Sequence, residues 1–142
     1  MYRLGIIGSS SGNGHPYSWA SIFNGYNADL MEKHCPFPLI PKYLKQQSWP
    51  DSRIKNAVVH GIWTQSNLES NLIAKCAEIS SVYDSLDHLL DSYSYILLAR
   101  DDAENHYLNC SRALQRGSFV YVDKPIALSV DDLTRLYDKS LS

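Results

Sequence analysis

The segment Leu4-Gly5-Ile6-Ile7-Gly8-Ser9-Ser10-Ser11-Gly12-Asn13-Gly14-His15 decides the fold of this chain. Its first four residues form a continuous apolar run, which is typical of a strand buried in a parallel sheet. A glycine-rich turn follows, and a segment with helical spacing begins directly after it. Glycines at such a turn let the backbone approach a pyrophosphate, whose charge the N–H groups and the helix dipole stabilise. The segment predicts a phosphate-binding loop between a first strand and a first helix.

The same alternation of apolar runs and helical segments continues along the chain. We expect strands at Leu4–Ile7, Ala57–Thr64, Ser81–Tyr83, Tyr95–Ala99 and Phe119–Val122. We expect helices at 17–25, 66–78, 85–90, 103–116 and from 129 onward, several of them preceded by a serine with capping-box spacing. Crossovers between parallel strands are right-handed almost without exception. These elements therefore predict an α/β fold with a doubly wound, mainly parallel sheet of the Rossmann type.

Residues 34–56 depart from this pattern. The stretch carries four prolines, together with Tyr43 and Trp49, and it is too long for an ordinary connection between a helix and a strand. Two interpretations are open: a functional loop or lid, and a covering that buries one face of the sheet.

Length and charge limit the classes of protein that fit. A chain of 142 residues, 44% of them apolar, can bury about two thirds of its unfolded surface in one core, so we expect one domain over residues 1–142. The formal net charge of −2 offers no basic excess for the phosphates of a duplex. We therefore expect no nucleic-acid partner.

The cysteines and the apolar runs suggest a location. Cys35, Cys76 and Cys110 are odd in number and widely spaced, which suits neither a disulfide framework nor a zinc site. We interpret them as reduced thiols and expect no metal. No run approaches the roughly 18 apolar residues of a membrane span, so we expect a cytoplasmic chain with no membrane partner.

The glycine loop supplies the first candidate site residues. Gly8 fits the first glycine of G-x-G-x-x-G, Ser10 stands where the second belongs, and the next two glycines are out of register. We expect a loop longer by a residue or two, in which serine hydroxyls supplement the backbone donors; a tight glycine turn without a ligand is the alternative. The predicted cofactor-binding residues here are Gly8, Ser9, Ser10, Ser11, Gly12, Asn13, Gly14 and His15.

The end of the second strand lacks the acid that often binds the adenosine ribose. Thr64 or Gln65 could bond a ribose hydroxyl, and Trp63 could stack on adenine, although Trp63 fits an ordinary core position equally well. No arginine follows to favour a 2′-phosphate, so NAD and NADP both remain open.

A charged cluster follows the fourth strand, where ligands bind in open α/β sheets. Asp101 and Asp102 could bind ribose, pair with Arg100 or cap the following helix. His106 lies one turn into that helix, and a satisfied buried histidine is favoured over a catalytic one, although we count it among the cofactor contacts.

Asp123-Lys124-Pro125 follows the fifth strand. A lysine at a strand end, beside a turn that proline stiffens, is well placed to polarise a substrate oxygen or to help move its proton. Asp123 could orient the lysine. A solvated Asp-Lys turn is the alternative from residue types alone.

These segments together resemble the N-terminal nucleotide-binding domain of the glucose-fructose oxidoreductase and inositol dehydrogenase family, Gfo/Idh/MocA. The matching residues are Leu4-Gly5-Ile6-Ile7-Gly8, Ala74-Lys75, His106, Gly117 and Asp123-Lys124-Pro125, where the family generally has Glu-Lys-Pro. The resemblance covers nearly the whole chain except residues 34–56. It implies that Lys124 lies near the nicotinamide and the substrate and assists catalysis, and that the glycine loop and the region of Asp101 and Asp102 hold the dinucleotide. Where many relatives have Thr-Pro-Asn after the fourth strand, this chain has Asp101-Asp102-Ala103.

The resemblance also implies an activity. Family members are NAD(P)-dependent oxidoreductases with a second, C-terminal α+β domain that completes the substrate pocket, and we expect this chain to be the first domain of such an enzyme, with NAD or NADP as cofactor. The expected substrate is a small molecule, a sugar or cyclitol derivative, and self-association is left open. Two alternatives remain: a non-catalytic sensor of NAD(P), and a domain that binds another nucleotide or a nucleotide sugar.

Overall fold

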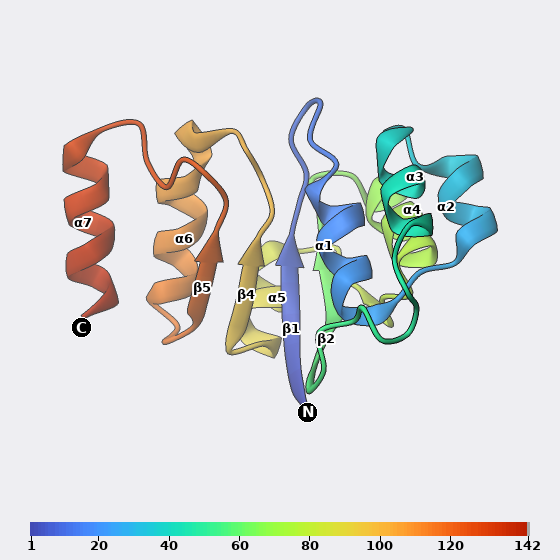
Figure 1. The fold of residues 1–142 in the computed structure, drawn as a ribbon. Helices are drawn as coiled ribbons and strands as arrows, with labels where there is room; N and C mark the ends of the chain where they lie inside the picture. Colours follow the sequence, from blue (N-terminus) through green and yellow to red (C-terminus); the bar gives the residue numbers. More distant parts are fainter. Residues whose placement is uncertain (142) are drawn as a thin grey trace.

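The computed structural model describes residues 1–141 and shows a five-stranded, all-parallel sheet with helices on both faces (Figure 1). The strands are β1 (Tyr2–Ile7), β2 (Ala57–Trp63), β3 (Ser81–Val82), β4 (Tyr95–Leu98) and β5 (Phe119–Val122). Their order across the sheet is β3-β2-β1-β4-β5, so the chain builds outward from β1 to one edge and then to the other. This is the doubly wound order, and the predicted fold class is confirmed.

The described residues also form seven α-helices and one short 3₁₀ helix; all lie between strands except α7, which follows β5. They are α1 (His15–Asn24), α2 (Ala28–His34), α3 (Leu39–Lys45), α4 (Asn67–Cys76), α5 (Leu86–Ser92), the 3₁₀ helix η1 (Ala103–Asn105), α6 (His106–Leu114) and α7 (Val130–Ser140). The serines expected to cap helices do so: the hydroxyls of Ser66, Ser85 and Ser129 accept hydrogen bonds from backbone N–H groups three residues later.

Some helix boundaries differ from those expected. Helix α1 begins at His15 rather than at residue 17, because Pro16 has no N–H to satisfy and suits the first helical turn. The single helix expected over 103–116 is split into η1 and α6, and the chain leaves it through Gly117, whose φ is +73°. A positive φ favours glycine, which explains the stop.

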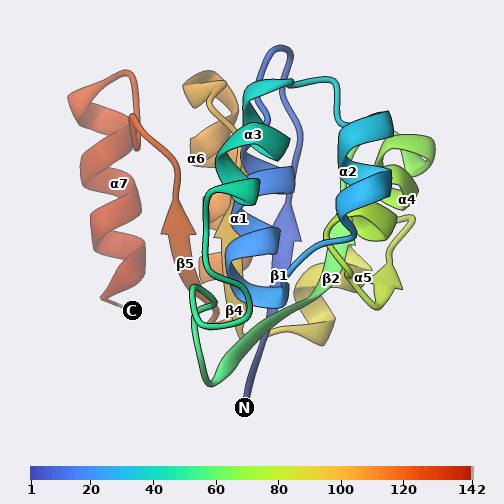
Figure 2. The ribbon, with the colours of Figure 1, turned by 45° about the vertical axis from the view of Figure 1, so that its right-hand side comes forward.

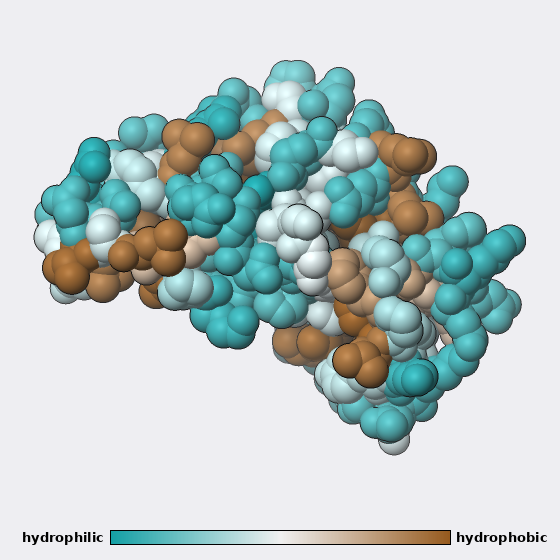
Figure 3. Space-filling view, turned by 90° about the horizontal axis from the view of Figure 1, so that it is seen from above, coloured by the Kyte–Doolittle hydropathy of each residue, from teal (hydrophilic) through white to brown (hydrophobic). Residues whose placement is uncertain are grey.

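The two faces of the sheet carry separate cores. One core lies under α1 to α4 and includes the fully buried Ile6, Met31 and Ile73. The other lies under α5, α6 and α7 and includes Leu89 and Leu98. Helix α7 packs on α6, and apolar side chains stay exposed on its outer side, where Figure 3 shows hydrophobic surface over the red end of the chain in Figure 1.

Residues 34–56 fold into a covering layer. The stretch contains α3, which lies over α1 in Figure 2, and it buries Leu44 completely. The Trp49 indole N–H donates to the Leu44 carbonyl at 2.8 Å, which closes the segment on itself. Of the two interpretations, the covering agrees with this packing. Neither α2 nor α3 was expected. For α3, closely spaced prolines obscure the helical pattern of the segment.

Candidate functional site

The carboxyl ends of the strands meet at one rim, and the glycine loop rises from that rim between β1 and α1 (Figure 1). Gly8 allows the loop to pass close to the helix, since a Cβ at this position would lie 2.5 Å from Cγ of Pro16. Gly12 has a φ of +80°, a conformation that favours glycine. A Cβ at Gly14 would lie 2.5 Å from Cδ1 of Ile40 and 2.9 Å from Cγ of Phe37. All three loop glycines therefore have a conformational or steric reason to be there.

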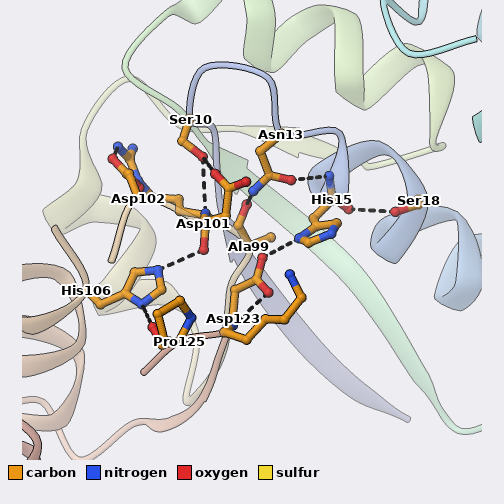
Figure 4. Close-up of polar contacts among 12 residues, drawn as sticks. Ser10, Asn13, His15, Ser18, Ala99, Asp101, Asp102, His106, Asp123 and Pro125 are labelled. Carbon is orange, nitrogen blue, oxygen red and sulfur yellow. Dashed lines mark hydrogen bonds and ion pairs between the residues drawn. The ribbon is translucent and has the colours of Figure 1, made fainter. Parts of the chain in front are cut away.

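Three contacts tie the loop to the ends of β4 and β5 (Figure 4). The Ser10 hydroxyl donates to the Asp101 carboxylate at 2.5 Å and accepts from the Asp101 N–H at 3.2 Å. The Asn13 amide donates to the Ala99 carbonyl at 3.3 Å. The Nδ1 of His15 bonds a carboxylate oxygen of Asp123. The sequence-predicted residues of the loop, the fourth strand end and the fifth strand end thus meet in one place.

The loop offers donors for an anion. Within residues 1–141, the backbone N–H groups of Ser10, Ser11, Gly12 and Gly14 donate to no protein acceptor, whereas those of Gly8, Ser9, Asn13 and His15 are bonded. Unpaired N–H groups at a glycine turn before a helix form the kind of cradle that binds phosphate. The loop therefore fits the pyrophosphate of a dinucleotide.

The end of β2 is arranged differently from what the sequence suggested. Thr64 is buried, and its hydroxyl bonds the backbone of Ser66 and the hydroxyl of Ser70. Gln65 uses its amide on Ser9, donating to the carbonyl at 2.8 Å and accepting from the N–H at 3.1 Å. Trp63 is partly buried and packs on the core beneath α5. The polar groups of Thr64 therefore hold the start of α4, and the side-chain amide of Gln65 supports the glycine loop.

The two aspartates of the charged cluster after β4, Asp101 and Asp102, make different contacts. Asp102 pairs with Arg100 through two hydrogen bonds, and Asn105 adds a third at 2.7 Å. Burial raises the pKa of Asp102, but the hydrogen bonds from Arg100 and Asn105 outweigh it and hold that pKa below its usual range. Asp101 faces the loop instead. Of the alternatives left open, pairing is correct for Asp102, and side-chain capping is not observed for either aspartate.

His106 is fully buried and links two strand ends. Its Nε2 contacts the Arg100 carbonyl and its Nδ1 contacts the Pro125 carbonyl, both at 2.8 Å. Neither ring nitrogen is free for a ligand, so the geometry agrees with the favoured interpretation of a satisfied core histidine. The ring instead joins the end of β4 to the Asp123-Lys124-Pro125 turn.

A cleft of about 410 Å³ opens beside this turn. It is lined by His15, Trp19, Tyr121, Val122, Asp123, Lys124 and Ile126. Asp123 is 3% exposed, and its second carboxylate oxygen accepts the Lys124 N–H at 2.8 Å, whereas Lys124 itself is exposed. The turn thus fixes a buried carboxylate below the cleft and a lysine at its edge.

Four residues that line this cleft were not predicted as site residues: Trp19, Tyr121, Val122 and Ile126. Two of them are aromatic. Trp19 stacks on His15, with ring centroids 5.2 Å apart, and meets Tyr121 edge to face at 5.4 Å. The spacing in the sequence could have identified Trp19 and Tyr121. Trp19 follows His15 by one helical turn, so the two side chains share a face of α1. Tyr121 lies two positions before Asp123, which directly follows β5, so these two side chains point to the same side.

Two kinds of feature are absent from residues 1–141. No group of three or more histidine, cysteine, aspartate or glutamate side chains is placed to hold a metal ion. In the same part of the chain, no helix is both long and apolar enough to cross a membrane.

An all-parallel doubly wound sheet with a glycine loop at its carboxyl rim defines a dinucleotide-binding Rossmann domain. Residues 42–140 match the model of the GFO_IDH_MocA family, described as an oxidoreductase family with an NAD-binding Rossmann fold. The chain belongs to this family, and the resemblance drawn from the sequence is confirmed. The cofactor class expected from the sequence agrees with the family description.

Solved structures share the fold. UDP-N-acetylglucosamine 3-dehydrogenase from Acidithiobacillus ferrooxidans is similar with a TM-score of 0.64 and 14% identity, over 98% of this chain and 34% of that one. A dehydrogenase (MviM) from Clostridium difficile is similar with a TM-score of 0.61 and 21% identity, over 99% of this chain and 36% of that one. The scyllo-inositol dehydrogenase from Lactobacillus casei is similar with a TM-score of 0.64 and 14% identity, over 97% of this chain and 32% of that one. The chain thus spans about a third of the length of these structures. None of the curated proteins compared with it matches.

Proposed function

We propose that this chain is the nucleotide-binding domain of an oxidoreductase that transfers hydride between a nicotinamide cofactor and a hydroxyl or carbonyl carbon of a sugar-like or cyclitol-like molecule. The observation that carries the proposal is the position of Lys124 at the cleft beside β5, on the same rim as the glycine loop. The nicotinamide, when bound, supplies the hydride chemistry. Lys124 then holds the substrate oxygen, and Asp123 fixes the backbone of the lysine.

The contacts of the loop indicate which residues would hold the cofactor. The unpaired N–H groups of residues 10–12 and 14 would bind the pyrophosphate, and Asp101 stands where it can meet a ribose hydroxyl. The neighbours named above include dehydrogenases of a nucleotide sugar and of an inositol, which supports a polyhydroxylated substrate. The second wall of the substrate pocket would come from a further domain, as the length of these neighbours suggests.

The test has a binding stage and a turnover stage. NADH and NADPH are titrated against the chain while nicotinamide fluorescence is followed, and we expect saturable binding of at least one. Oxidised cofactor is then supplied with a panel of polyols, and absorbance of the reduced nicotinamide is recorded for the chain joined to its second domain. Lys124→Ala should remove turnover and leave the cofactor Kd within about threefold. Lys55→Ala is the matched control, because Lys55 is exposed at the opposite end of β2.

A sensor of NAD(P) is the second candidate. The replacement of Thr-Pro-Asn by Asp101-Asp102-Ala103 and the lack of an acid at Thr64 favour it, since both alter the part of the rim that contacts cofactor. A sensor binds nicotinamide with no turnover in any polyol. A domain for another nucleotide or a nucleotide sugar binds neither NADH nor NADPH.

A further inference from the structure

His15 and Asp123 form a pair that the function described above does not use. The Nδ1 of His15 bonds Oδ2 of Asp123, and the Asp123 side chain is almost completely buried, with 2% of its surface exposed. A carboxylate oxygen can only accept, so Nδ1 must donate. In a neutral ring this leaves Nε2 with a lone pair.

That lone pair has no partner in the part of the chain that the structure describes. Among residues 1–141 no hydrogen bond is made by Nε2, and 31% of the His15 side chain stays exposed where the ring lines the 410 Å³ cleft. Stacking on Trp19 and the position of His15 at the first residue of α1 hold the ring in place. Lys124 borders the same cleft.

We propose that His15 and Asp123 are an acid–base dyad whose Nε2 takes the proton of the substrate hydroxyl in the cleft beside Lys124. The proton-transfer role rests on the proposed function, because that function supplies the reaction. The tautomer of the dyad does not depend on the proposed function. An orienting carboxylate that holds one ring nitrogen protonated and leaves the other basic is the arrangement that general-base histidines use.

The step balances without a further reactant. In oxidation of the alcohol, the carbon–hydrogen bond breaks with its electron pair passing to the oxidised nicotinamide. The oxygen–hydrogen bond breaks with its proton passing to Nε2, and the carbon–oxygen double bond forms. The imidazolium then releases the proton to water, and reduction runs the same steps in reverse. Lys124 holds the oxygen while charge develops on it.

The first test reads the tautomer directly. Long-range ¹H–¹⁵N correlation spectra of the labelled chain, recorded with the imidazole ring neutral, should show Nδ1 protonated and Nε2 bare. In Asp123→Asn the amide oxygen keeps the Lys124 N–H, so the NH₂ group faces His15, and the proton should move to Nε2. Asp51→Asn, in the exposed turn before β2, is the control and should change nothing. A protonated Nε2 in the native chain overturns the dyad, and that measurement needs no variant to fold.

The second test asks whether a ligand in the cleft reaches Nε2. Diethylpyrocarbonate acylates bare imidazole nitrogens, and mass spectrometry gives the rate at each histidine. NAD⁺ or NADP⁺ with myo-inositol should slow acylation of His15 at least about fivefold and leave the exposed His34 and His88 unchanged. Unchanged acylation of His15 with cofactor bound overturns the placement of the ligand.

Turnover supplies the third test. In the assay described under Proposed function, His15→Gln should lower kcat about 10²-fold or more while the NADH Kd stays within about threefold. An equal kcat overturns the proton-transfer role. If neither NADH nor NADPH binds, the proposed function fails and the tautomer result stands by itself. If NADH binds and Nε2 carries the proton, the dyad alone fails.

Discussion

The side-chain amide of Gln65 makes two hydrogen bonds to the backbone of Ser9, donating to its carbonyl at 2.8 Å and accepting from its N–H at 3.1 Å. A residue at the end of β2 thus holds the second residue of the glycine loop in the manner of a strand partner. Dinucleotide sites often have an acidic residue that binds the ribose at the end of this strand. In this chain, Gln65 shapes the glycine loop there instead.

Removing this amide should loosen the loop. Gln65→Ala deletes both bonds, each worth about 0.5–1.5 kcal/mol net, so the free energy of unfolding should fall by about 1–3 kcal/mol in urea titrations. NADH or NADPH Kd should rise about threefold to tenfold, because the loop must be ordered on binding. Gln46→Ala, on the exposed end of α3, should change neither quantity by more than about 0.5 kcal/mol. An unchanged Kd in Gln65→Ala contradicts a loop-shaping role.

The rim at β2 should discriminate poorly between the two nicotinamide cofactors. Residues 63–66 hold neither a carboxylate to bond a 2′-hydroxyl and repel a 2′-phosphate nor a cation to attract that phosphate. We expect the Kd values for NADH and NADPH to lie within about tenfold, or about 1.4 kcal/mol. Fluorescence titration of both at one ionic strength measures the ratio. A preference above about a hundredfold in either direction would show that residues elsewhere read the 2′ position.

His106 should act on stability and on the geometry of the fifth strand end. His106→Ala leaves the carbonyls of Arg100 and Pro125 without their ring partner and creates a cavity, and we expect a loss of about 2–5 kcal/mol. His88→Ala, whose side chain is 71% exposed on α5, should cost less than about 0.5 kcal/mol. Urea unfolding followed by tryptophan fluorescence compares the two. Equal stability of both variants would rule out the proposed link between β4 and the lysine turn.

The parts of this structure that sequence predicts are those that local residues decide. Ser66, Ser85 and Ser129 cap helices through contacts three residues away, and all five strands lie within a few residues of their expected positions. The contacts that build the site are of another kind. His15 and Asp123 are 108 residues apart and Ser9 and Gln65 are 56 apart, so only the sheet order brings them together. The sequence predicts that these residues lie at the rim, but it does not predict which of them contact each other.

The pair of Arg100 and Asp102 should make stability depend on pH in the acid range. The folded-state pKa of Asp102 lies below its unfolded value of about 3.9, so the folded state favours the charged carboxylate. Its stabilisation is fully present above that value and is lost as pH falls through the lower, folded pKa. At pH 7 Asp102→Asn should be less stable by about 1–3 kcal/mol, since Arg100 stays buried without its anion. The difference between native chain and variant should hold down to about pH 4 and shrink as pH is lowered further, whereas Asp51→Asn should show no such trend. Urea unfolding at each pH measures it, and a constant difference would mean that the ion pair does not contribute to folding.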